Sequence, residues 1–221
     1  MKIVSVIHKR LSYVIWPVIA SLSVATSANA VTPTTPASGT VINSYHKVNS
    51  LSGTSISVDT SAGISAGDRG VLIQMKGATI NLSDNASHGD ITGYASAGRF
   101  EYVDVTSVSG SNIVLANAPT VHFQAAGYVQ FVRIPVYDGT TLSGTIAAAP
   151  WDGNKGGVVA IDDIGTLTLS GDIDVTGLGF AGGAVATATP YDSCASDQNN
   201  YTGGIQVGTG NKGEGITAPN A

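Results

Sequence analysis

The stretch YVQFVRIPV, residues 128–136, carries apolar side chains on both of its alternating faces. Val129 and Phe131 fall on one face of the expected strand, and Val132 and Ile134 fall on the other. A half-exposed strand alternates apolar with polar residues, so this pattern indicates a strand that is covered on both sides. The stretch therefore predicts a small β-barrel or a β-sandwich.

A hairpin is expected upstream, in VDVTSVSGSNIVLA (residues 103–116), where the turn sequence SGSN separates two runs rich in Val and Ile. No stretch shows convincing helical periodicity. Polar residues 77–99 form a long excursion between strands. The strands expected between residues 40 and 138 are Thr40–Val48, Thr54–Asp59, Gly70–Lys76, Phe100–Val108, Ser111–Ala116 and Tyr128–Val136.

Glycine becomes frequent after residue 138, with 17 of the 28 glycines in residues 139–221. In GTLTLSGDIDVTG (residues 165–177), two short runs alternate apolar residues with hydroxyls or carboxylates, and glycine marks the corners. Residues 139–180 therefore predict the first rungs of a glycine-rich parallel β-helix. Residues 181–221 are glycine-rich and irregular, with no closing element, so we expect a truncated N-terminal piece of a longer protein.

The N-terminus has the order of a secretory signal peptide. Three basic residues within Met1–Arg10 precede an apolar run, and Ala28-Asn29-Ala30 is a small-x-small cleavage site. We expect cleavage after Ala30, no transmembrane span in the mature chain, and a Pro/Thr/Ser linker over residues 31–39. The protein is expected to be extracellular or on the cell surface, with the periplasm as the alternative.

Charge is scarce, since Asp, Glu, Lys and Arg make up 11% of the chain against about 25% in ordinary domains. Cleavage would remove three basic residues and leave seven against 15 acidic ones, a net charge of −8. This balance argues against nucleic-acid binding, which needs clustered Lys and Arg. Cys194 is the only cysteine, so no intrachain disulfide is available, and an inert thiol is favoured over a catalytic one. The sequence leaves the oligomeric state open.

Asp152 and Asn154, in WDGNKGG (residues 151–157), are spaced like the first half of a calcium loop. The motif is incomplete, because Gly156 stands at its fifth position and no Glu follows at the required distance. The favoured interpretation is a tight Asp-Gly turn, with Trp151 covering the end of the β-helix.

Asp172 and Asp174 share a strand face, and stacking could bring Asp162 or Asp163 near them. Such carboxylates can hold Ca²⁺ or act as acid and base, but they are also typical of a solvated strand face, which is favoured. A pectate-lyase-like enzyme would need a base, and Lys155 is the only basic residue between Arg133 and Lys212. No G-x-S-x-G or H-E-x-x-H motif is present, and no cofactor other than calcium is considered.

Six blocks of sequence, in this order, resemble the N-terminal region of large exported, glycine-rich, adhesin-like surface proteins of gliding or surface-attached Gram-negative bacteria. The blocks are GDRGVLIQMKGA, GRFEYVDVTSVSGSNIVLAN, GYVQFVRIPVYDG, APWDGNKGGVVA, GTLTLSGDIDVTGLGFAGG and NKGEGITAP. The resemblance spans about residues 40–217 and implies a small β-domain leading into a glycine-rich β-helical stretch. It implies export and a surface role, and it supplies no catalytic residues.

The sequence thus predicts a non-enzymatic exported module, structural or adhesive, whose partners are glycans or other surface proteins. One alternative is a carbohydrate-active enzyme of the β-helix class, against which the low aromatic content of 6% counts. The other is a calcium-dependent glycan-binding module that uses Asp152 and Asn154 or Asp172 and Asp174.

Overall fold

A computed structural model describes residues 39–182 and 213–217. This part of the chain is all-β, as predicted, with a single 3-10 turn, η1 (Ala125–Gly127). The predicted signal peptide (1–30), nearly all of the predicted linker (31–39) and Cys194 lie outside the described residues, as does most of the segment 181–221.

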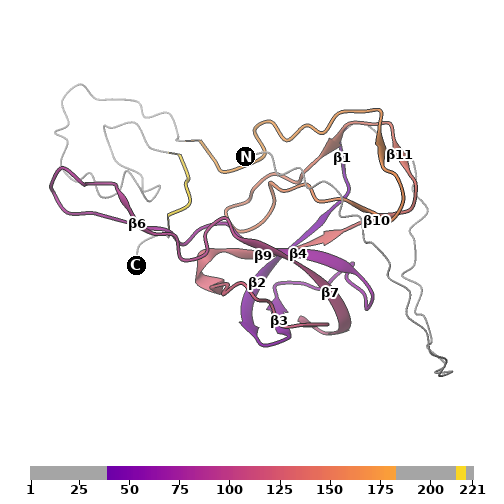
Figure 1. The fold of residues 1–221 in the computed structure, drawn as a ribbon, viewed down its shortest axis with the longest axis horizontal. Helices are drawn as coiled ribbons and strands as arrows, with labels where there is room; N and C mark the ends of the chain where they lie inside the picture. The colour runs from indigo at the N-terminus through magenta and orange to yellow at the C-terminus, as the bar shows by residue number, and fades with distance from the viewer. Residues whose placement is uncertain (1–38, 183–212, 218–221) are drawn as a thin grey trace, which may run out of the picture.

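Six antiparallel strands close into a barrel (Figure 1). Their order around the barrel is β2-β3-β8-β7-β4-β9, so the barrel alternative holds and the sandwich does not. The strands are β2 (Ser44–Ser52), β3 (Ser55–Val58), β4 (Arg69–Gln74), β7 (Phe100–Ser109), β8 (Asn112–Leu115) and β9 (Val129–Ile134).

Strand β9 is covered on both sides, which confirms the prediction from its two apolar faces. Val129 and Phe131 lie in the barrel core. Val132 and Ile134 form a second cluster with Val71 and its β4 neighbour Ile73, on the outside of the barrel. Val158 and Ala160, from the glycine-rich part of the chain, pack against this outer cluster.

The predicted hairpin is strands β7 and β8, which pair antiparallel up to Ser109 and Asn112. Only Gly110 and Ser111 connect them, and Gly110 has a φ of +55°, a conformation that favours glycine in tight turns.

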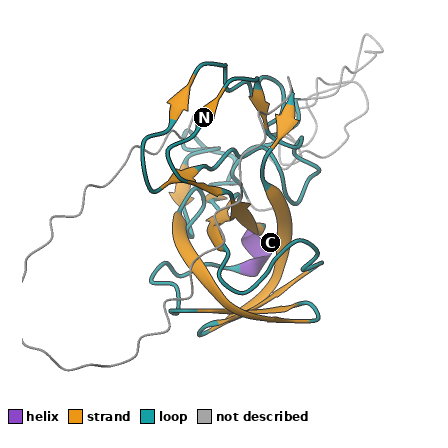
Figure 2. Ribbon diagram, turned by 90° about the vertical axis from the view of Figure 1, so that its right-hand side faces the viewer, coloured by secondary structure: helices purple, strands orange, loops and turns teal. Residues whose placement is uncertain are grey.

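Beyond the barrel, two successive turns of chain stack in parallel. Strand β10 (Val136–Tyr137) pairs with β13 (Asp162–Asp163), β11 (Thr141–Leu142) pairs with β14 (Thr168–Leu169), and Ile146 bridges to Ile173. Partners are therefore 26 or 27 residues apart along the chain. Tyr137, Leu142 and Ile146 form a small core inside these turns. Figure 2 shows the curved barrel strands at one end of the molecule and these short strands at the other.

The strand pairs show that the first and last residues of the predicted barrel segment, 40–138, belong to the stack. Strand β1 (Thr40–Val41) pairs in parallel with β12 (Ile146–Ala147), and β10 follows β9 directly into the first turn. The single strand expected over Thr40–Val48 is interrupted at Ile42 and Asn43. The amide of Asn43 donates to the carbonyls of Arg133 and Ala160, which holds the chain at the boundary between barrel and stack.

The predicted excursion forms an arm, residues 77–98, that projects from the barrel (Figure 1). Strands β5 (Thr79–Ile80) and β6 (Ile91–Gly93) pair antiparallel along it. At its base, the buried amide of Gln74 donates to the carbonyls of Lys76 and Ala95.

Gly70 offers a test of the barrel core, because the Phe131 ring lies against its backbone. A Cβ added at Gly70 would come within 2.3 Å of the ring. We expect Gly70→Ala to lower the free energy of unfolding by about 1–3 kcal/mol, since a packed core resists added volume. Denaturant unfolding measures this. Gly179→Ala is the matched control, because a Cβ there meets no atom within 4 Å; equal stability of the two variants would contradict the packing described.

Candidate functional site

The four residues considered for calcium lie in two parts of the stack. Asp152 forms a turn in which its Oδ1 accepts the backbone N–H groups of Asn154 (2.8 Å) and Lys155 (2.9 Å), as the turn interpretation expects. Asp172 and Asp174 flank Ile173 in the second turn, and Asp174 Oδ1 accepts the N–H of Thr176. Within residues 39–182 and 213–217, no three His, Cys, Asp or Glu side chains gather in a group suited to a metal ion.

Thermal unfolding of the protein with and without calcium tests whether the ion binds at Asp152, Asn154, Asp172 and Asp174. If these residues bind the ion, adding CaCl₂ should raise Tm and excess EDTA should lower it, because a ligand that binds only the folded state stabilises that state. At 100 times Kd the gain is about 2.7 kcal/mol. Identical Tm values in the two solutions would mean that these residues do not bind calcium.

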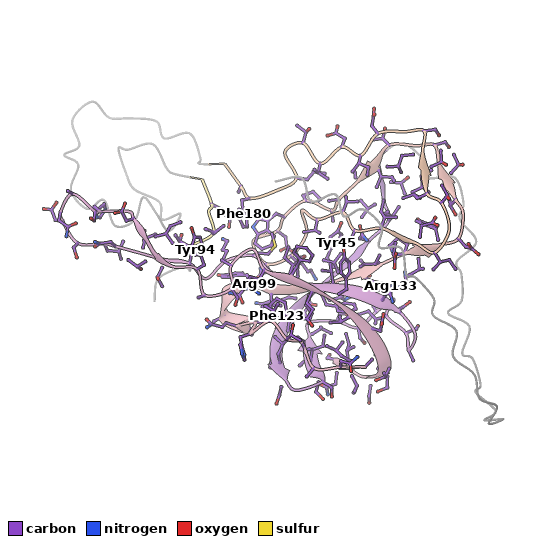
Figure 3. The ribbon with its side chains drawn as sticks, viewed as in Figure 1. Tyr45, Tyr94, Arg99, Phe123, Arg133 and Phe180 are labelled. Atoms are coloured by element: carbon purple, nitrogen blue, oxygen red, sulfur yellow. The ribbon has the colours of Figure 1, made fainter. Side chains whose placement is uncertain are left out.

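Buried and half-buried polar side chains join the barrel to the stack. The Tyr45 hydroxyl donates to the carbonyl of Val158 at 2.6 Å and accepts the N–H of Ala149. The amide of Gln130 exchanges two hydrogen bonds with the backbone of Gly156. Burial raises the pKa of Tyr45 to about 12, so it remains a neutral donor. Figure 3 shows Tyr45 between the barrel and the stacked turns.

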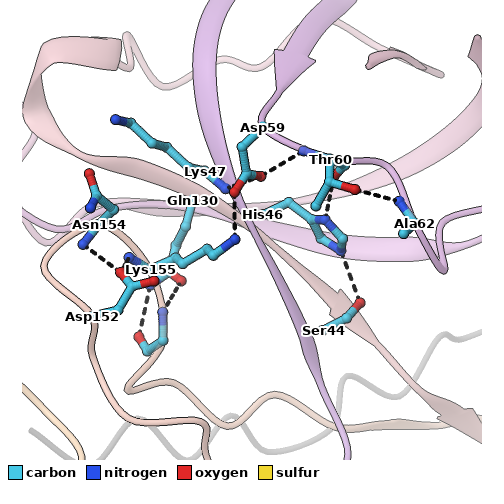
Figure 4. A network of polar contacts seen from close by, with 11 residues as sticks. Ser44, His46, Lys47, Asp59, Thr60, Ala62, Gln130, Asp152, Asn154 and Lys155 are labelled. Carbon is cyan, nitrogen blue, oxygen red and sulfur yellow. Dashed lines mark hydrogen bonds and ion pairs between the residues drawn. The ribbon is translucent and has the colours of Figure 1, made fainter. Parts of the chain in front are cut away.

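Two ion-pair groups tie the same two parts together. Arg69 of β4 contacts Asp104 of β7 at 2.8 Å and Asp162 of the stack at 2.6 Å. Lys155, beside the Asp152 turn, pairs with Asp59, which follows β3 (Figure 4). Lys155 therefore helps to hold the stack against the barrel, at the contact between them that we call the junction.

His46, one of the three histidines of the predicted mature chain, is buried in the barrel. Its Nδ1 donates to the carbonyl of Thr60 at 2.6 Å, and its Nε2 accepts from the hydroxyl of Ser44 (Figure 4). Burial lowers the pKa of His46, which favours the neutral ring. The imidazole therefore acts as a structural hydrogen-bonding group.

Lys76 is the centre of a cluster that sequence reasoning missed. Its ammonium lies 5.1 Å from the ring centre of Tyr128, 5.7 Å from that of Trp151 and 5.4 Å from that of Phe180. It also pairs with Glu214 at 2.8 Å. The members come from five separate parts of the sequence, so no local spacing could have revealed the cluster.

The Lys76 cluster secures the segment 213–217. The backbones of Glu214 and Ala181 are joined by a hydrogen bond, and Thr217 bridges in parallel to Ala78 at the base of the arm. Burial alone would raise the pKa of Glu214, but hydrogen bonds from Lys76 and from the backbone N–H of Ala181, together with the charge of Lys76, outweigh it, so the pKa lies below its usual 4.5. The ionised carboxylate is therefore the form bound in the folded protein.

Glu214→Gln should lower the free energy of unfolding at pH 7 by about 1–3 kcal/mol, because a charge-assisted hydrogen bond is lost. A carboxyl group whose pKa is depressed on folding stabilises the protein above its unfolded pKa, and this contribution disappears as pH falls through the folded pKa. The difference from wild type should thus shrink below pH 4.5. Urea unfolding between pH 3 and 7 measures it. Asp84→Asn, on the exposed tip of the arm, is the control, and a pH-independent difference would contradict this account.

The largest exposed aromatic side chains on the barrel lie on the outer face of β7. Phe100 and Tyr102 are 41% and 46% exposed, with ring centres 6.0 Å apart in an edge-to-face arrangement. Asp104 follows on the same face and is bound to Arg69. Sequence analysis placed these residues on a strand but attached no function to them.

No protein-family model and no curated protein matches this chain. Among solved structures, it is similar to the Gp54 tailspike of Acinetobacter baumannii bacteriophage AP22, determined in complex with A. baumannii capsular saccharide, with a TM-score of 0.30 and 18% identity. The match covers 59% of this chain and 22% of the tailspike.

Two further matches are tailspikes of Pseudomonas phages. Gp49 of phage LKA1 has a TM-score of 0.28 and 18% identity, over 50% of this chain and 17% of gp49. Gp61 of phage phi297 has a TM-score of 0.25 and 12% identity, over 66% of this chain and 29% of gp61. The chain thus spans less than a third of each tailspike, and similarity at this level assigns it no function.

Proposed function

We propose that this chain is a non-enzymatic, exported module of a bacterial surface protein, in which a closed barrel mounts the first turns of a glycine-rich β-helix and contributes to adhesion. The observation that carries the proposal is the continuity of β9 with β10: one strand closes the barrel, and the chain then enters the parallel stack without a linker.

The regular spacing of the paired residues in the stack supports a β-helix, in which further turns of chain would continue the same arrangement. Backbone pairs recur at 26 or 27 residues, so each turn of chain lies on the preceding one. A parallel coil of this kind buries its apolar residues only by stacking on a neighbour. The barrel supplies the first neighbour, because its outer cluster of Val71, Val132 and Ile134 packs against residues 158 and 160.

A structural role for the charged side chains supports a non-enzymatic module. Arg69, Lys76 and Lys155 are each paired with a carboxylate from another part of the fold. Removing any of them from its partner for proton transfer would loosen a contact between two separate segments of the fold. A general base must be free to exchange protons with a substrate.

Export is supported by the signal-peptide pattern of residues 1–30. Within the described residues, no helix is long and apolar enough to cross a membrane.

Three measurements on the full chain, expressed with its own leader in a Gram-negative host, test this function. Intact mass should show that the exported protein begins at Val31, and surface biotinylation of intact cells should label it. Incubation with a panel of polysaccharides should release no reducing ends. A retained leader, or a protein inaccessible to the reagent, would contradict the surface role, and reducing-end formation would favour the carbohydrate-active enzyme.

A further inference from the structure

We propose that the outer face of β7 is a carbohydrate-binding platform, where one of the perpendicular rings of Phe100 and Tyr102 stacks on the apolar face of a neutral pyranose ring and the other contacts its edge. Asp104 and Arg69 bind the hydroxyls at the rim of the sugar. This inference deepens the proposed adhesive function and rests on it.

Strand β7, which carries the two rings, and its neighbour β4 hold the platform rigid. Phe100 and Tyr102 are two residues apart on β7, so their side chains leave the same face of the sheet. Their backbone partners on β4 are Ile73 and Val71, both buried in the outer cluster. The edge-to-face contact of the two rings further restricts their motion. Groups fixed in this way lose little conformational entropy when a ligand binds.

Polar groups lie directly beside the rings. Asp104 continues the same face of β7, opposite Arg69 in the register of β4. The Asp104 side chain is 55% exposed and that of Arg69 is 42% exposed, and Arg69 is also held by Asp162. An oriented carboxylate and guanidinium offer acceptors and donors in a fixed arrangement.

The small size of the apolar surface favours a sugar over a protein. A fully buried aromatic side chain covers about 150–250 Å². Less than half of each ring is exposed here, so together they offer on the order of 200 Å². A stable protein interface needs about 800 Å² from each partner. A sugar ring is smaller, with an apolar C–H face bordered by hydroxyls, which matches two rings bordered by an ion pair.

Charge favours a neutral sugar. Arg69 is already neutralised by two carboxylates, Asp104 and Asp162. The predicted mature chain carries a net charge of −8, which repels polyanions. The platform is therefore suited to neutral polysaccharides and not to uronic-acid polymers.

Affinity electrophoresis of the exported full chain tests the platform, with dextran, mannan or laminarin in the gel and alginate as the acidic comparison. We expect at least one neutral polysaccharide to retard the protein and alginate to leave its mobility unchanged. The double variant Phe100→Thr/Tyr102→Thr should weaken the retardation about tenfold or more, because both aromatic contacts to the sugar are lost. Threonine keeps the strand propensity of β7.

Tyr94→Thr is the matched control, because Tyr94 is the most exposed tyrosine among the described residues, at 61%, and lies on the arm (Figure 3). It should bind like wild type. Because more than half of each substituted β7 ring is buried, the double variant should melt lower than wild type, so binding is compared well below the Tm of every variant. Undiminished retardation of the double variant would overturn the platform while leaving an adhesive function in place. Failure of wild type to bind any of the neutral polysaccharides would also overturn it, whereas leader cleavage and surface labelling decide the surface role separately.

Discussion

The burial of both faces of β9 is the constraint on which the rest of this structure depends. On one face, Val129 and Phe131 fill the barrel, and Phe131 packs so closely on β4 that only glycine fits at position 70. On the other face, Val132 and Ile134 lie beneath the glycine-rich chain. A strand with one apolar face would close the barrel and leave the stack without support. The two parts therefore share a single strand and are fixed relative to each other by their cores.

The contact between barrel and stack also needs polar groups, because the chain that crosses the barrel over residues 149–161 forms few strand pairs. Buried backbone N–H and C=O groups without partners are costly. Tyr45, Gln130 and Asn43 meet this need, since each bonds to the backbone of the crossing segment. Ion pairs of Arg69 with Asp162 and of Lys155 with Asp59 lie at the edge of the contact between barrel and stack. Both ion pairs thus lie where the two parts meet.

This use of charge shapes the functional conclusion. The basic side chains at the junction hold separate segments together, and the Lys76 cluster fixes residues 213–217 to the base of the arm in the same way. The part of the barrel that we propose for ligand binding is the exposed outer face of β7, where two aromatic rings stand beside an ion pair. A rigid mount that displays two exposed aromatic rings beside an ion pair is consistent with the proposed adhesive function.

The all-β class, the two-sided strand at residues 128–136 and the turn at Gly110 could be predicted from the amino-acid sequence, because they depend on side-chain alternation and on local backbone conformation. The sequence also located the Asp152 turn, whose bonds lie within four residues. Only the tertiary structure decided the order of barrel strands, the pairing of Thr40 with Ile146, and the enclosure of Lys76 by three rings and a carboxylate. These contacts join residues far apart in the chain, and their geometry follows from how the cores pack, which leaves no periodic signal in the sequence.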